Sequence, residues 1–212
     1  MKNILCFGDS NTYGANPNNM LRWELNERWT GILQSILKDD VYIIESGLSG
    51  RTTVFDDPIT PGRSGIAALP YVLEAASPLD LVIVMLGTND CKNYFSATAP
   101  VIALGMNKII ECIQDLRWYP GFSRPEILLV SPILIDEGCE TASGCISFDE
   151  NSPLKSRGLA PAYEQVAITH GVHFFNAASV SSPGVDCVHM DKKDHKALAE
   201  ALSVKVKEIL KI

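Results

Sequence analysis

The sequence predicts an α/β protein, a three-layer α/β/α sandwich built around a five-stranded parallel sheet. Five short apolar runs, at residues 4–7, 41–44, 81–86, 127–130 and 172–175, alternate along the chain with segments of helical periodicity. Continuous apolar runs of this length are typical of strands that are buried on both faces of a parallel sheet. Strands that alternate with helices favour right-handed crossovers, which place helices on both faces of one sheet.

The segments between the apolar runs justify the helical layers. Residues 29–37 carry one apolar stripe, and residues 191–210 carry another at four-residue steps, the pattern of helices that pack on a sheet. Residues 64–76, 98–117 and 153–170 are the other expected helices. No repeat, low-complexity tract or linker divides the 212 residues, so we expect residues 1–212 to form a single domain.

Composition excludes several classes of protein. The net charge of −7 and the lack of a basic stripe argue against nucleic-acid binding, and no apolar run is long enough to cross a membrane. The N-terminal run is too short for a signal peptide, which leads us to expect a cytoplasmic protein. None of the six cysteines forms a CxxC pair, so we expect free thiols and no structural metal; Cys139 and Cys145 are the pair that oxidation could join.

Small polar clusters follow the apolar runs. They are Gly8-Asp9-Ser10-Asn11, Gly47-Leu48-Ser49-Gly50-Arg51-Thr52 and Gly87-Thr88-Asn89-Asp90, and a fourth, Asp186-Cys187-Val188-His189, precedes the last helix. In parallel sheets ligands bind beyond the carboxyl ends of the strands. The four clusters are therefore expected to meet at one edge of the sheet.

The residue types in these clusters suit acyl transfer, which needs a nucleophile, a base and donors for an oxyanion. Ser10 can supply the hydroxyl, His189 the base, and Asp186 a group that orients the base. The Ser10 and Gly50 N–H groups and the Asn89 amide can supply the donors. Each cluster alone could equally be a turn or a helix cap, and it is their joint occurrence in this order that favours chemistry.

Together the clusters resemble the four sequence blocks of the SGNH (GDSL) hydrolase superfamily, from residue 4 to residue 189. The resemblance implies a flavodoxin-like fold, a serine esterase with no cofactor, and an acyl-enzyme on Ser10. By motif it implies a catalytic triad of Ser10, Asp186 and His189, and an oxyanion hole formed by Ser10, Gly50 and Asn89.

A closer similarity is to the arylesterase/acyltransferase (perhydrolase) branch, carried by segments that include Gly47 to Thr53 and Met85 to Asp90. It implies hydrolysis of short-chain or aryl esters, possible acyl transfer to alcohols, and a homo-oligomer. Cys187 stands where that branch usually has glycine, and because the cysteine side chain is small we expect little damage. The stretch 139–153 matches no block, so the branch does not indicate the substrate.

Other residues compete for the same roles. His195 is the rival base, but two turns into the last helix it would lie too deep, while His170 and His173 are expected to be structural. Asp191 is well placed to cap the last helix. Asp9 and Asp90 are expected to anchor turns, and no G-x-S-x-G elbow occurs, which argues against the α/β-hydrolase fold.

The walls of the site are less defined by the sequence. Possible contributors are Tyr13, Trp23, Lys92, Tyr94, Phe95 and residues 132–134, and the loop 16–26 could be a lid, a subunit contact or simple surface. A carbohydrate O-acetyl esterase would use the same machinery. A non-catalytic binding domain and a flavin or nucleotide binder are the alternatives of other classes, and the second lacks a P-loop and a GxGxxG.

Overall fold

The computed structural model describes residues 1–142, 145 and 147–212. Five parallel strands form one sheet in the order β2-β1-β3-β4-β5. Their bounds are Lys2–Gly8 (β1), Val41–Gly47 (β2), Leu81–Met85 (β3), Glu126–Ser131 (β4) and His173–Asn176 (β5). The fold predicted from the apolar runs is confirmed, and this strand order is that of flavodoxin-like proteins.

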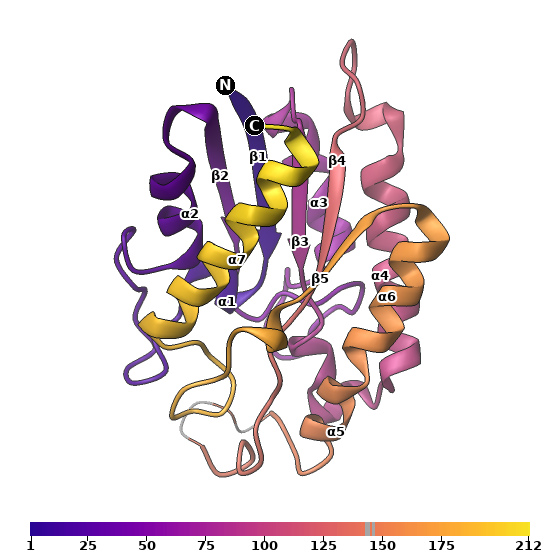
Figure 1. The fold of residues 1–212 in the computed structure, drawn as a ribbon. Helices are drawn as coiled ribbons and strands as arrows, with labels where there is room; N and C mark the ends of the chain where they lie inside the picture. Colours follow the sequence, from indigo (N-terminus) through magenta and orange to yellow (C-terminus); the bar gives the residue numbers. More distant parts are fainter. Residues whose placement is uncertain (143–144, 146) are drawn as a thin grey trace.

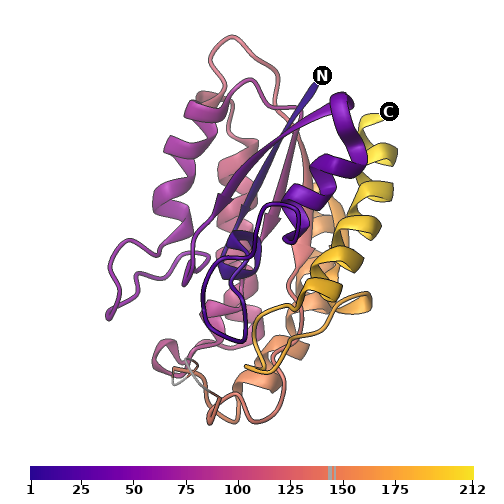
Figure 2. The ribbon, with the colours of Figure 1, turned by 90° about the vertical axis from the view of Figure 1, so that its left-hand side faces the viewer.

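Helices cover both faces of the sheet (Figures 1 and 2). On one face, α2 (Trp29–Leu37) packs against α7 (Lys192–Leu210), above a core that includes Leu33, Leu198 and Leu202. On the other face lie α3 (Gly65–Ala76), α4 (Ala99–Gln114) and α6 (Leu159–His170), above a core that includes Leu73, Ile109 and Tyr163. The sheet is thus buried on both sides, as its uninterrupted apolar strands require.

Two expected helices are shorter than their periodicity suggested. Residues 153–170 form two helices, α5 (Ser152–Arg157) and α6, which are separated at Gly158. Pro161 lies in the first turn of α6, where its lack of a backbone N–H costs no helical hydrogen bond. The helix expected over 98–117 ends at Gln114, and a short 3-10 helix at Leu116–Trp118 follows it.

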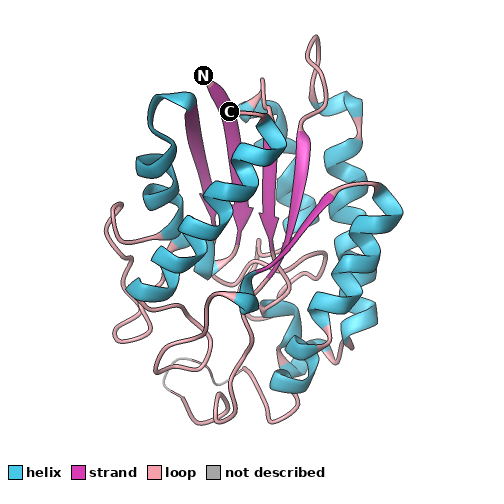
Figure 3. Ribbon diagram, in the orientation of Figure 1, coloured by secondary structure: helices cyan, strands magenta, loops and turns pink. Residues whose placement is uncertain are grey.

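The carboxyl ends of the strands meet at one end of the molecule, where the loops gather (Figure 3). The four polar clusters lie here: α1 (Ser10–Tyr13) follows β1, residues 48–53 follow β2, and residues 87–90 follow β3. The loop that precedes α7 brings residues 186–190 to the same end. Among the described residues, no helix is long and apolar enough to cross a membrane.

Candidate active site

The turn between β1 and α1 presents Ser10. Helix α1 begins at Ser10, one residue after the buried Asp9, whose carboxylate accepts a hydrogen bond from Asn11 N at 3.0 Å. Gly8 allows the close approach of this helix to the strand, because a Cβ on Gly8 would lie 2.1 Å from Thr12 Oγ1. The Ser10 side chain is thereby held at the end of the sheet, on a backbone fixed on both sides.

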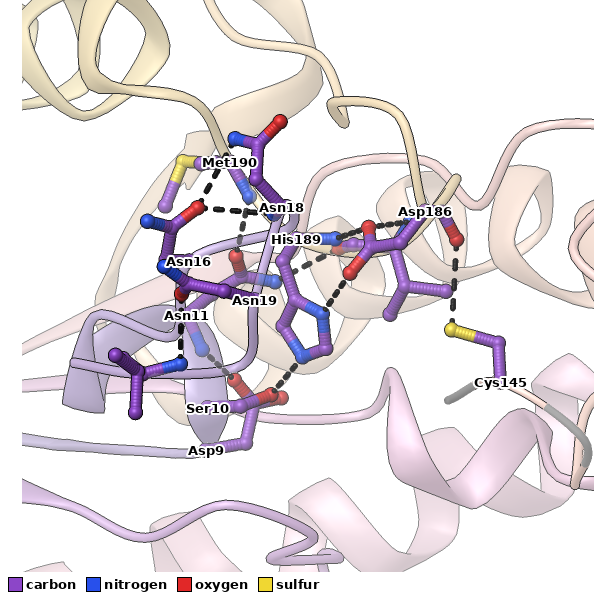
Figure 4. A network of polar contacts seen from close by, with 12 residues as sticks. Asp9, Ser10, Asn11, Asn16, Asn18, Asn19, Cys145, Asp186, His189 and Met190 are labelled. Atoms are coloured by element: carbon purple, nitrogen blue, oxygen red, sulfur yellow. Dashed lines mark hydrogen bonds and ion pairs between the residues drawn. The ribbon is translucent and has the colours of Figure 1, made fainter. Parts of the chain in front are cut away.

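Ser10, His189 and Asp186 form a continuous chain of hydrogen bonds (Figure 4). His189 Nε2 lies 2.8 Å from Ser10 Oγ, and His189 Nδ1 lies 2.5 Å from Asp186 Oδ2. All three residues are buried. A hydroxyl, an imidazole and a carboxylate in this order can activate the hydroxyl as a nucleophile, since the imidazole can take its proton while the carboxylate fixes the ring.

Asp186 is kept ionised by its own loop. Burial raises the pKa of this carboxyl, but hydrogen bonds from the His189 side chain and from backbone N–H groups outweigh it, so its pKa is lowered. Its Oδ1 accepts from His189 N at 2.8 Å and from Val188 N at 3.0 Å. The loop thus turns tightly around the carboxylate, which is then charged when it faces the imidazole.

Gly50 and Asn89 lie beside Ser10 and line the same small pocket. Gly50 has a φ of 82°, a backbone conformation that side chains disfavour. One N–H of the Asn89 amide donates to Arg51 O at 3.1 Å, which fixes the amide plane and leaves its second N–H for a ligand. A backbone N–H and an amide N–H held next to a nucleophile can stabilise an oxyanion.

The pocket in front of Ser10 has a volume of about 160 Å³. Its walls combine the residues already named with Met20, Lys92, Cys145, Phe148 and Val188. A volume of this size accommodates a small group such as a short acyl chain.

Comparison with known proteins identifies the family to which this chain belongs. The model of the GDSL-like lipase/acylhydrolase family matches residues 6–197. The chain belongs to this family. It is therefore a carboxylic ester hydrolase. A search among curated proteins found no match.

Solved structures of similar proteins extend the comparison. The aryl esterase of M. smegmatis is 39% identical, with 99% of this chain and 100% of the other covered and a TM-score of 0.91. A carbohydrate acetylesterase family member from Sinorhizobium meliloti is 33% identical over 100% of both chains, with a TM-score of 0.93. A carbohydrate acetylesterase from the same organism is 36% identical, with 99% and 100% covered and a TM-score of 0.91. The resemblance to SGNH hydrolases is confirmed.

The rival histidines of this acylhydrolase lie elsewhere. His195 is fully buried in the core, where its Nδ1 accepts from Trp29 N at 3.3 Å. Burial lowers the pKa of His195 to about 3, so it stays neutral. His170 contacts the Gln114 and Asn107 side chains, and His173 lies 3.4 Å from Glu126. These three histidines contact core or surface groups rather than Ser10.

The aspartates that were expected to be structural form hydrogen bonds with the backbone or with neighbouring side chains. Asp90 accepts hydrogen bonds from Thr53 N at 3.0 Å and Thr53 Oγ1 at 2.5 Å. Burial raises the pKa of both Asp9 and Asp90 to about 6. Asp191 occupies the N-cap position of α7, but the expected capping bond is absent, because only its backbone carbonyl accepts from the first turn. That prediction was right in position and wrong in mechanism.

Two residues that sequence analysis left without a role support the site. Asn11 spans two segments, since its Nδ2 donates to Val188 O at 3.1 Å and its Oδ1 accepts from Met190 N at 3.0 Å (Figure 4). Arg51 is buried below the site and donates to Gly8 O at 2.8 Å, with its guanidinium 4.1 Å from the centre of the Phe7 ring. Their positions in the quoted clusters were the only available signal.

Of the suggested wall residues, only Lys92 lines the pocket. Trp23 donates to Met190 O, Tyr13 lies under Arg22, and Phe95 stacks on Phe55. Ile133 is buried in the core. The loop 16–26 contributes Met20, and the stretch 139–153 contributes Cys145, Ser147 and Phe148. That stretch, which matched no sequence block, therefore forms part of the wall.

The structure has all six cysteines as free thiols. Cys145 is buried, and its Sγ lies 3.4 Å from Asp186 O, which places the thiol against the loop that carries Asp186 (Figure 4). Burial raises the pKa of the Cys145 thiol to about 12. A thiol with so high a pKa is a packing group and not a nucleophile.

Proposed function

We propose that the protein hydrolyses short-chain or aryl carboxylic esters through an acyl-enzyme on Ser10. The observation that carries the proposal is the unbroken chain of hydrogen bonds from Asp186 through His189 to Ser10, which opens into a pocket of about 160 Å³. The size of the pocket supports a small acyl group.

In the first half-reaction, Ser10 Oγ forms a bond to the ester carbonyl carbon while its proton passes to His189 Nε2. The negative charge on the carbonyl oxygen is stabilised by the N–H groups of Ser10 and Gly50 and by the Asn89 amide. The carbon–oxygen bond to the alcohol then breaks, and His189 gives its proton to the departing alcohol.

In the second half-reaction, water attacks the acyl-enzyme and loses a proton to His189. The bond to Ser10 Oγ breaks, the carboxylic acid leaves, and the proton returns to Ser10. Throughout, the Asp186 carboxylate holds the ring orientation and stabilises the imidazolium. A second alcohol in place of water would make the same acyl-enzyme a transferase, and the appearance of a new ester in alcohol–water mixtures would test this.

The test of the esterase proposal is hydrolysis of p-nitrophenyl acetate and butyrate, with EDTA present. We expect wild type to turn over both esters, with acetate preferred, and Ser10→Ala to lose about 10³-fold or more in kcat. Ser123→Ala, at an exposed serine far along the chain from the four clusters, is the matched control. Equal activity of Ser10→Ala and wild type would remove Ser10 from the mechanism.

A carbohydrate O-acetyl esterase is the second candidate. It is favoured by the similarity to two carbohydrate acetylesterase structures, which would share the catalytic geometry and differ in the alcohol that they accept. Faster release of acetate from acetylated sugars than from aryl acetates would favour this candidate over the aryl esterase.

A further inference from the structure

Lys92 is a charged residue in the wall of a pocket that both polar and apolar residues line. It follows the amide Asn89 by three residues, and its side chain is only 13% exposed. Met20, Phe148 and Val188 supply the apolar lining. A lysine so nearly buried requires a partner, because burial of an unpaired ammonium removes its hydration without compensation.

Asp57 is that partner, and it fixes the ammonium in place. Asp57 Oδ2 accepts from Lys92 Nζ at 3.1 Å and from Tyr94 OH at 2.8 Å, while Oδ1 accepts from Ile59 N at 2.9 Å and Thr60 N at 3.0 Å. Burial raises the pKa of Asp57, but these hydrogen bonds outweigh it and hold the pKa well below its usual range. The carboxylate is therefore charged and rigid, and it neutralises the charge of Lys92.

The ammonium has donors to spare. A lysine carries three N–H donors, and the Lys92 ammonium donates to Asp57 and lies 5.7 Å from the centre of the Tyr94 ring. Lys92 also lines the small pocket that contains Ser10 and Asn89. A fixed donor in the wall of a pocket gives specificity, because a ligand that lacks an acceptor leaves the donor unpaired.

We propose that Lys92 is a specificity-determining residue that donates a hydrogen bond to an uncharged oxygen of the substrate near the reacting ester. The enzyme then prefers esters with an ether, hydroxyl or carbonyl oxygen close to the ester group over hydrocarbon esters of the same size. The acyl part and the alcohol part are the two possible sources of this oxygen. The proposal rests on the proposed esterase function and names its substrate class.

Two pairs of isosteric esters test the proposal. For the acyl side, the pair is p-nitrophenyl methoxyacetate and p-nitrophenyl butyrate. For the alcohol side, it is 2-methoxyethyl acetate and butyl acetate. The quantity measured is the ratio of kcat/KM within each pair, for wild type and for Lys92→Met. Comparing ratios between enzymes cancels the higher intrinsic reactivity of the oxygen-containing ester.

We expect Lys92→Met to lower the ratio at least about tenfold in one pair, which identifies the side that carries the oxygen. Lys92→Gln, which keeps an N–H donor, should restore part of the ratio. Lys155→Met is the matched control, since Lys155 donates to Cys91 O at 3.2 Å and is not part of the pocket wall, and it should leave both ratios unchanged.

A structural role for Lys92 would give a different result. If Lys92 only tethers the Asp57 loop, Lys92→Met lowers both members of each pair equally, and unchanged ratios in both pairs would overturn the proposal. Hydrolysis of p-nitrophenyl butyrate that depends on Ser10 tests the esterase function separately. A failure of the esterase proposal can therefore be distinguished from a failure of the proposal about Lys92.

Discussion

At the scale of single residues, Asp186 orients His189, because its charged Oδ2 lies 2.5 Å from His189 Nδ1. Asp186→Asn keeps the shape but offers an amide that can favour the wrong tautomer of the ring. We expect kcat for p-nitrophenyl acetate to fall about 10³–10⁴-fold with KM little changed. Asp191→Asn, which alters the loop next to His189 but no capping bond, is the control. Wild-type activity of Asp186→Asn would remove this residue from the mechanism.

Cys187 shows a second effect at this scale. The sequence suggested that a cysteine is harmless here because it is small, but the residue has a φ of 66°, so the relevant cost is backbone strain rather than volume. Glycine adopts this conformation freely, although it loses more entropy on folding. We expect Cys187→Gly to raise the free energy of unfolding in urea by about 0.5–1 kcal/mol. Cys187→Ala keeps the strain and should stay near wild type; equal values for the two variants would contradict this account.

At the scale of elements, the site depends on how α1 is joined to the loop before α7. The Asn11 amide connects the two segments, because its Nδ2 donates to Val188 O and its Oδ1 accepts from Met190 N. Asn11→Ala leaves the buried Met190 N–H and Val188 carbonyl without partners, which costs about 1–3 kcal/mol for each unsatisfied group. We expect kcat to fall about 10–100-fold, because His189 lies between the two released residues. Asn19→Ala is the control, since the Asn19 side chain accepts a hydrogen bond from Leu21 N in its own loop. Unchanged kcat in Asn11→Ala would show that α1 does not position His189.

The same scale explains what the sequence could and could not predict. Apolar runs located all five strands to within three residues at each end, because burial on both faces leaves no polar interruption. The catalytic candidates followed, because the ends of parallel strands converge. The break at Gly158 was missed because a single glycine is tolerated inside a helical segment and does not by itself mark an end. Phe148 and Cys145 were missed because a loop has no period, and their contacts with residues 188 and 186 are set only by the tertiary fold.

At the scale of the whole molecule, ionisable groups buried below the site make stability depend on pH. Asp9 and Asp90 are both fully buried there, with the guanidinium of Arg51 near Asp9. Desolvation of the charged form is the main cause of each raised pKa. The carboxylates of Asp57 and Asp186 have lowered pKa values and act in the opposite direction, so a single variant is needed to separate the two effects.

The variant Asp90→Asn separates the effect of a carboxylate with a raised pKa from the effects of those with lowered pKa values. In the folded protein the pKa of Asp90 is about 6, against an ordinary value of 3.8. The folded state therefore holds this proton more tightly than the unfolded state does, and the associated stability is present below pH 4 and lost as pH rises through 6. We expect the unfolding free energy of wild type, measured in urea relative to that of Asp90→Asn, to fall by about 2–3 kcal/mol between pH 4 and pH 7. Both proteins share the other carboxylates, whose effects cancel in the difference except for that of Asp9, because its charge contributes to the raised pKa of Asp90. Asp56→Asn controls for the loss of an exposed negative charge. A difference that does not change with pH would mean that Asp90 ionises as easily in the folded chain as in the unfolded one, and that its bonds to Thr53 fully offset its burial.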